Sequence, residues 1–109
     1  MVTIKACYID DERQYMEFKA QLTANNQIDE NEKIFGVAVE WEKEKSNYTK
    51  WPFIVSPDDG HWAFVEWEGS DQVTMIDLMG RNVVVGATFT RIDGMQGKSN
   101  YKIKSIAVA

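Results

Sequence analysis

The residue types that carry most enzymatic chemistry are scarce in this chain. It has one histidine, His61, and one cysteine, Cys7, among 109 residues. The usual zinc site needs several nitrogen or sulfur ligands, which these two cannot supply. His61 directly follows an acidic, glycine-containing turn at 58–60, where we expect a solvated imidazole rather than a general base with ordered partners. Cys7 lies in a predicted strand, where a free thiol usually packs as a small apolar group. We therefore predict no catalytic residue, no metal and no cofactor.

Other spacings that resemble known motifs fail in their context. Gly97-Lys98-Ser99 matches the end of a phosphate-binding loop, but that loop needs a glycine where this chain has Ile92, and a helix rather than a strand afterwards. Glu40 and Glu66 could face each other as the two carboxylates of a glycosidase, but a chain this short has little room for a sugar groove as well. The acidic groups Asp58-Asp59 and Asp10-Asp11-Glu12 do not have the spacing of a calcium-binding loop. None of these patterns predicts an enzyme.

Charge is distributed very unevenly along the chain. Residues 1–77 hold sixteen acidic and seven basic residues, a balance of −9, whereas residues 78–109 hold one acidic and five basic residues, a balance of +4. The net charge is −5. Nucleic-acid binding by the main surface is disfavoured, because contacts to phosphate require basic stripes. An acidic surface instead favours a basic partner through electrostatic complementarity, with a merely solvated surface as the alternative.

The chain is predicted to begin with a strand and a helix. Val2, Thr3 and Ile4 favour a strand over 2–8. From Asp11 the pattern changes: Gln14 completes a variant of the capping box, and Tyr15, Phe18 and Leu22 recur at helical spacing. We therefore predict a helix over 11–24, which packs these three apolar side chains on a sheet.

Alternating patterns and turn residues predict strands through the rest of the chain. The turn 56–60, Ser-Pro-Asp-Asp-Gly, indicates a hairpin, and residues 25–33 and 43–50 are polar enough to be loops. The predicted strands cover 34–42, 52–56, 61–68, 73–78, 83–92 and 101–108. The expected fold class is α+β: one N-terminal helix packed on a curved antiparallel sheet or partial barrel of six to seven strands, in a single domain over 1–109.

Two strands share a pattern that predicts an acidic face. In 34–42, Val37, Val39 and Trp41 fall in one phase, and the glutamates at 40, 42 and 44 fall in the other. Strand 61–68 repeats this, with Val65 and Trp67 opposite two further glutamates. We expect the apolar phase to point inward and the acidic phase outward. Tyr48 and Trp51 are candidate aromatic anchors beside this face. The candidate partner-binding residues are Glu40, Glu42, Glu44, Tyr48, Trp51, Asp58, Asp59, Glu66, Glu68 and Asp71.

The C-terminal segment carries one family resemblance. Gly86-Ala87-Thr88-Phe89-Thr90-Arg91-Ile92-Asp93-Gly94, followed by Tyr101-Lys102-Ile103-Lys104-Ser105-Ile106, resembles the C-terminal hairpin of small bacterial immunity proteins that neutralise contact-dependent or other polymorphic toxins. This resemblance covers about a quarter of the chain and implies a role only. The implied role is toxin neutralisation, and the charge distribution adds the expectation that the toxin is a basic nuclease whose active site the acidic face covers.

The expected function is therefore that of a non-catalytic inhibitor of a basic protein. The N-terminal segment reaches Asp10 before any apolar stretch of signal-peptide length develops, and no run is long enough to span a bilayer. These two observations predict a cytoplasmic protein without membrane contact. The alternative function is a small β-barrel that binds a ligand or acts as an accessory protein, with aromatic residues lining a pocket.

Overall fold

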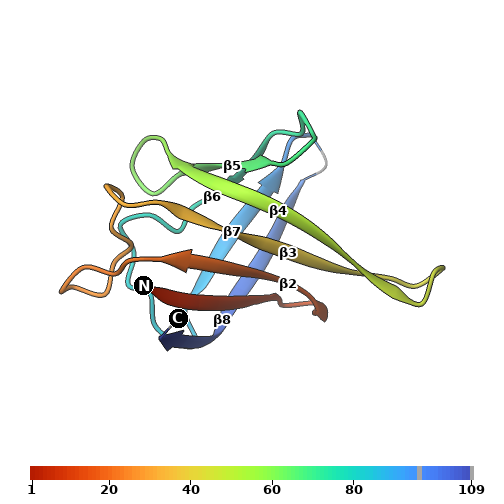
Figure 1. Ribbon diagram of the computed structural model, residues 1–109, viewed down its shortest axis with the longest axis horizontal. Helices are drawn as coiled ribbons and strands as arrows, with labels where there is room; N and C mark the ends of the chain where they lie inside the picture. Colours follow the sequence, from red (N-terminus) through yellow and green to blue (C-terminus); the bar gives the residue numbers. More distant parts are fainter. Residues whose placement is uncertain (96, 109) are drawn as a thin grey trace.

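The computed structural model describes residues 1–95 and 97–108, and these form a closed antiparallel barrel (Figure 1). Each strand pairs with the next in the chain, and β1 also pairs with β8, which closes the sheet. The elements are β1 (Val2–Tyr8), β2 (Asp11–Ala20), β3 (Ile34–Glu42), β4 (Asn47–Pro57), β5 (Ala63–Trp67), β6 (Thr74–Ile76), β7 (Thr88–Asp93) and β8 (Lys98–Val108). The antiparallel meander predicted from the sequence is confirmed, but the class is all-β rather than α+β.

The predicted helix over 11–24 is wrong, because its residues form β2. Ile9 and Asp10 make a tight turn, and β2 then runs back along β1 with Phe18 opposite Ile4. The segment contains a second pattern: Met16, Phe18 and Ala20 alternate with polar residues and are fully buried. Pairing with strands on both sides satisfies the backbone of β2 and favours this period of two over the helical one.

Several strand limits differ from the prediction. The bounds of β1 and β3 are confirmed, but β4 begins at Asn47, within the predicted loop 43–50. The loop is a short turn instead, so β3 and β4 project as a long hairpin at the right of Figure 1. The strand predicted over 83–92 begins only at Thr88. The strand predicted from 101 begins at Lys98.

Apolar side chains fill the barrel and one of its ends. Phe18 makes edge contacts with Phe53 and Phe89 at the centre, with ring centroids 5.3 and 6.0 Å apart. The loops 21–33 and 77–87 close the end where β2 stops and β3 begins, and they are joined by a hydrogen bond from the Val83 amide to the Asn26 carbonyl. Buried side chains in these two loops complete the cap: Ile28, Leu78, Met79 and Val83. We call this the capped end.

The orientation predicted for β3 is reversed. Ile34 and Ala38 belong to the core, so the side chains in their phase, Glu40 included, point toward the barrel interior. Trp41 lies on the outside, where its ring meets the edge of Tyr48 on β4, with ring centroids 4.9 Å apart. Val39 is buried but does not join the core. The small residues of β3 leave the interior space to aromatic residues of other strands, and this explains the reversal.

In the part of the chain that the structure describes, no helix is long and apolar enough to cross a membrane.

Candidate functional site

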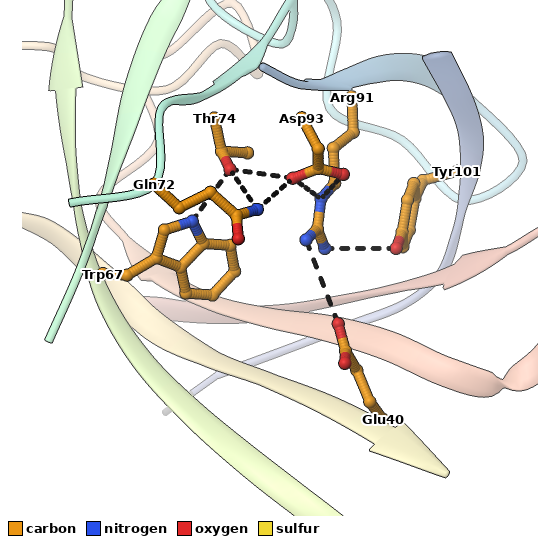
Figure 2. Close-up of polar contacts among 7 residues, drawn as sticks. All are labelled: Glu40, Trp67, Gln72, Thr74, Arg91, Asp93 and Tyr101. Atoms are coloured by element: carbon orange, nitrogen blue, oxygen red, sulfur yellow. Dashed lines mark hydrogen bonds and ion pairs between the residues drawn. The ribbon is translucent and has the colours of Figure 1, made fainter. Parts of the chain in front are cut away.

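The end of the barrel opposite the cap contains a buried charge. Arg91 lies in the inward phase of β7, two residues after the core residue Phe89, and it is only 6% exposed. Its Nε donates hydrogen bonds to both carboxylate oxygens of Asp93, at 3.1 and 3.0 Å (Figure 2). Its Nη1 donates to the Tyr101 hydroxyl on β8 at 3.3 Å. We call this end the Arg91 end.

Two further side chains hold Asp93 in place, and Trp67 supports one of them (Figure 2). The Thr74 hydroxyl donates to Asp93 Oδ1 at 2.8 Å and itself accepts the indole N–H of Trp67, also at 2.8 Å. Gln72 donates its amide N–H to Asp93 Oδ1 at 3.0 Å. The carboxylate is therefore fixed from β5, from β6 and from the loop between them. Because removing water from both charges is costly, these hydrogen bonds are needed to keep the pair stable.

Aromatic rings surround the guanidinium. The centre of the Arg91 guanidinium lies 5.1 Å from the Trp67 ring and 5.8 Å from the Tyr101 ring, both within the range of cation–π attraction. Tyr101 also stacks on Phe89, with ring centroids 5.7 Å apart. Burial raises the pKa of Tyr101, and the adjacent Arg91 partly offsets this rise. The phenol thus stays protonated and available as a hydrogen-bond partner.

Glu40 approaches the same group from β3, but it is held less firmly. Its Oε1 lies 4.0 Å from Arg91 Nη2, which is an ion-pair distance but too long for a hydrogen bond. The Glu40 side chain is 41% exposed, against 7% for Arg91. We call the whole group the Arg91 cluster: Glu40, Trp67, Gln72, Thr74, Arg91, Asp93 and Tyr101.

Two small cavities open beside the Arg91 cluster, one on each side of the Glu40–Arg91 pair. The first has a volume of about 190 Å³ and is lined by Glu40, Trp51, Trp67, Ser70, Gln72 and Arg91. The second has a volume of about 260 Å³ and is lined by Glu40 and Arg91 together with Tyr8, Gln14, Asp93, Gly97, Lys98, Ser99 and Tyr101. Both fall below the volume of about 300 Å³ at which pockets for drug-sized ligands begin. Each can hold a single side chain or a fragment of similar size.

A second surface lies outside the barrel, where apolar side chains point to solvent from three neighbouring strands. Phe35 on β3 pairs with Ile54 on β4, and Phe64 on β5 is the diagonal neighbour of Ile54. Ile54 is 60% exposed. Val37 pairs with Pro52 in the next row. We call this set the apolar stripe: Phe35, Val37, Pro52, Ile54 and Phe64. A groove of about 580 Å³ lies along it, between residues 32–36 and 52–55.

Acidic side chains border the apolar stripe. Glu66 lies directly opposite Ile54, and its carboxylate accepts a hydrogen bond from the Ser56 hydroxyl at 2.7 Å. Glu68 follows β5 and donates its amide N–H to the Pro52 carbonyl at 3.0 Å. Glu17 on β2 pairs with Val37. Glu32 and Lys33 line the groove, Lys19 lies opposite Phe35, and Lys50 follows in the row beside Pro52. The border thus holds four acidic and three basic residues.

The glutamates predicted to share one face are split by the barrel. Glu40 faces the interior at the Arg91 end, whereas Glu66 and Glu68 border the apolar stripe. β4 separates β3 from β5, so their glutamates are not on adjacent strands. Glu42, near the tip of the β3–β4 hairpin, accepts a hydrogen bond from the Thr49 hydroxyl at 2.6 Å. That bond and the nearby Lys45 lower the pKa of Glu42.

The remaining predicted residues are scattered. Glu44 is exposed in the hairpin turn, and Tyr48 packs on Trp41 close by. Trp51 was the predicted interface anchor, and it lies at the cavity beside Glu40 with 42% of its surface exposed. The other predicted acidic residues lie exposed in turns: Asp58 and Asp59 at the capped end, and Asp71 between β5 and β6. The structure thus brings Glu66 and Glu68 together, and it places Trp51 with Glu40.

His61 and Cys7, the two residues considered for catalysis, both have contacts that indicate a structural role. His61 is exposed, as expected, but its Nδ1 donates a hydrogen bond to the Met79 carbonyl at 2.6 Å, which ties the β4–β5 turn to the capped end. Cys7 is buried, as expected, and this burial raises its pKa above the usual value for a thiol. A raised pKa keeps the sulfur protonated and lowers its reactivity.

Sequence reasoning missed Arg91 and the apolar stripe. A signal for Arg91 was present, because it shares the inward phase with Phe89 in a strand that was correctly predicted to exist. The apolar stripe was hidden by the assumption that the outward phase of each strand is the polar one. In β3 the inward-facing positions include Gly36 and Ala38, which have almost no apolar side chain. The larger apolar residues of β3 therefore face outward, opposite to the prediction.

Comparison with known proteins adds no further assignment: no family model matches the chain, and neither a curated protein nor a solved structure matches it. Within residues 1–95 and 97–108, no group of three or more His, Cys, Asp or Glu side chains is placed to hold a metal ion.

Proposed function

We propose that this chain is a non-catalytic binding protein that docks on a basic partner protein through the apolar stripe and its acidic border. The observation that carries this proposal is the exposure of apolar side chains on three consecutive strands, β3, β4 and β5. Contiguous exposed apolar patches with polar rims are typical of protein interfaces. Other exposed apolar residues lie in loops rather than across neighbouring strands, such as Val73 and the adjacent Val84 and Val85.

Charge selects the kind of partner. Glu17, Glu32, Glu66 and Glu68 border the apolar stripe, against Lys19, Lys33 and Lys50, and the whole chain has a net charge of −5. A second copy of the chain would bring like charges together in a symmetric interface, which disfavours self-association. A basic protein instead gains attraction at the border and buries apolar area at the centre.

An inhibitory role follows if the partner is a nuclease. Nucleases need basic surfaces for phosphate, and an acidic protein that covers such a surface blocks the substrate. The resemblance of the C-terminal segment to bacterial immunity proteins supports this role, with a toxin nuclease as the target and the cytoplasm as the place of action. A ligand enclosed in the barrel is less well supported, since Met16, Phe18 and Phe53 fill its centre.

The proposal can be tested by capture from the cells that produce the protein, followed by an inhibition assay. We expect the immobilised chain to retain a basic protein at low salt, and to inhibit its nuclease activity once that protein is purified. Ile54→Lys should weaken this binding by about tenfold or more, because it places a charge at the apolar centre of the interface. Glu66→Lys with Glu68→Lys should slow association, and added salt should do the same.

Val85→Lys is the matched control, since Val85 is equally exposed but lies far along the chain in the β6–β7 loop. It should leave capture unchanged. Equal capture by the Ile54→Lys and parent chains, or a captured protein without nuclease activity that stays bound at high salt, would contradict the proposal.

A further inference from the structure

The cavity lined by Trp51 and Trp67 also contains a carboxylate, that of Glu40, which is only weakly paired. Arg91 satisfies Asp93 and Tyr101, but Glu40 touches Arg91 only at 4.0 Å. Among the described residues, Arg91 is the one cation that lines this cavity, and its charge is already matched by Asp93. Because Asp93 already balances Arg91, the negative charge of Glu40 is not balanced, and its carboxylate lines a cavity of about 190 Å³.

We propose that this cavity receives an arginine side chain of the partner protein, with Glu40 as the carboxylate that pairs with the incoming guanidinium. The proposal deepens the proposed function and rests on it for the identity of the partner. It adds a defined contact at the Arg91 end to the contact made by the apolar stripe.

The charges around the cavity favour a cation over an anion. An anion would have to approach Glu40 and compete with Asp93 for Arg91, whose Nε is already committed to both Asp93 oxygens. A cation meets the opposite situation, because Glu40 and Asp93 together outweigh Arg91. Glu40 and Arg91 line both cavities, and the second adds Asp93 and Lys98, whose charges are opposite, so the first cavity differs from the second mainly by its two indole rings.

The walls favour a guanidinium over an ammonium. Trp51 and Trp67 line the cavity together with the polar Ser70 and Gln72. A planar guanidinium can stack on an indole while its N–H groups make a two-point contact with a carboxylate. The cavity is too small for a drug-sized ligand but suits one side chain.

One residue, Trp67, connects the cavity with the apolar stripe. Trp67 also borders a shallow depression with Pro52, Ile54, Glu66 and Glu68, on the outside of β4 and β5. A partner seated on the apolar stripe is therefore adjacent to the cavity entrance. One basic loop of that partner could fill the cavity while its apolar residues cover the apolar stripe.

The test uses a probe that does not depend on finding the partner. We would titrate the full chain with the peptide acetyl-Gly-Arg-Gly-amide and follow the indole N–H signals of Trp51 and Trp67 by NMR, after assigning them with single Trp→Phe variants. The peptide with citrulline in place of arginine has almost the same shape without the charge. We expect saturable shifts of both indole signals with the arginine peptide, and at least about tenfold weaker binding of the citrulline peptide.

Two variants locate the contact. Glu40→Gln should weaken binding of the arginine peptide by about tenfold, because a charge-assisted pair becomes a neutral hydrogen bond. Glu44→Gln removes the same charge from the exposed hairpin turn and should leave the affinity unchanged. Ile54→Lys should also leave peptide binding nearly unchanged, because Ile54 belongs to the apolar stripe and does not line the cavity.

The outcomes separate this proposal from the proposed function. Equal binding of the arginine and citrulline peptides, unchanged affinity in Glu40→Gln, or tighter binding of propionate than of the arginine peptide would overturn the arginine site and leave capture through the apolar stripe intact. Loss of partner capture combined with specific arginine binding would instead overturn the proposed function and leave a cation site at the Arg91 end.

Discussion

At the Arg91 end of the barrel a charged side chain is buried, whereas on the outside of β3, β4 and β5 apolar side chains are exposed. The buried charge has partners: Asp93, Tyr101 and the rings around them. The exposed apolar side chains, Ile54 above all, have few neighbours and do not belong to the core. The comparison indicates that the Arg91 cluster, apart from Glu40 at its edge, is mainly needed for folding, while the apolar stripe is better explained by binding.

Breaking the Arg91 cluster should have the largest effect on stability. Arg91→Met leaves the largely buried carboxylate of Asp93 without its cation, and losses of about 3–5 kcal/mol in the free energy of unfolding are typical of such changes. Urea denaturation of the parent and the variant measures this loss.

Arg13→Met is the control for Arg91→Met, because Arg13 also pairs with an aspartate, Asp11, but the two side chains are 56% and 26% exposed. Exposed pairs contribute about 0–1 kcal/mol. Similar losses in the two variants would show that the burial of Arg91 does not give it the structural importance assigned here.

The second largest effect concerns Gly36 on β3, one of the three strands that carry the apolar stripe. A Cβ atom at Gly36 would overlap the carbonyl oxygen of Glu17 on β2. The Cβ atom is fixed to the backbone of β3 and the oxygen belongs to the backbone of β2, so the two strands would have to move apart. We expect Gly36→Ala to lower the free energy of unfolding by about 1–3 kcal/mol, the usual cost of overpacking. Thermal denaturation followed by circular dichroism would detect this change, and an unchanged melting temperature would contradict the close approach of β2 and β3.

On the outer side of the same region, substitution should hardly affect folding. Ile54 is 60% exposed, and its side chain lies outside the core, so Ile54→Lys should change the free energy of unfolding by no more than about 0.5 kcal/mol. The measurement is urea denaturation, carried out beside the partner-binding assay. A loss of several kcal/mol would mean that the apolar stripe stabilises the barrel, and weaker binding by this variant could then not be assigned to the interface.

The sequence predicted the antiparallel meander but not its closure or the orientation of every strand. Turn residues such as Asp58, Asp59 and Gly60 mark where strands end, and that information is local. The choice between helix and strand for 11–20 was not local, because Tyr15 and Phe18 fit a helix while Met16 and Phe18 fit a strand. Pairing with β1 and β3 decided between the two patterns.

The candidate site was harder to predict than the fold, because it depends on which phase of each strand faces inward. For β5 the apolar phase faces inward as predicted, and Glu66 is correctly placed outside. For β3 the inward phase holds Gly36 and Ala38, so counting apolar bulk gave the wrong orientation for Glu40. Arg91 could be placed inside only once Asp93, Tyr101 and Glu40 were known to converge on it.

The smallest expected effect is a pH dependence that comes from an exposed ion pair. Lys104 on β8 lies 2.6 Å from Glu12 on β2, and this contact spans the outside of β1. A hydrogen bond from Lys104 lowers the pKa of Glu12 below its usual value. The stability gained from this carboxylate is therefore complete above the unfolded-state pKa, near about 4.3, and is lost as the pH falls through the lower folded-state pKa. Glu12→Gln should flatten the acid side of the stability profile, whereas Glu44→Gln should not, and equal profiles for Glu12→Gln and the parent would show that the pair is too solvent-screened to contribute.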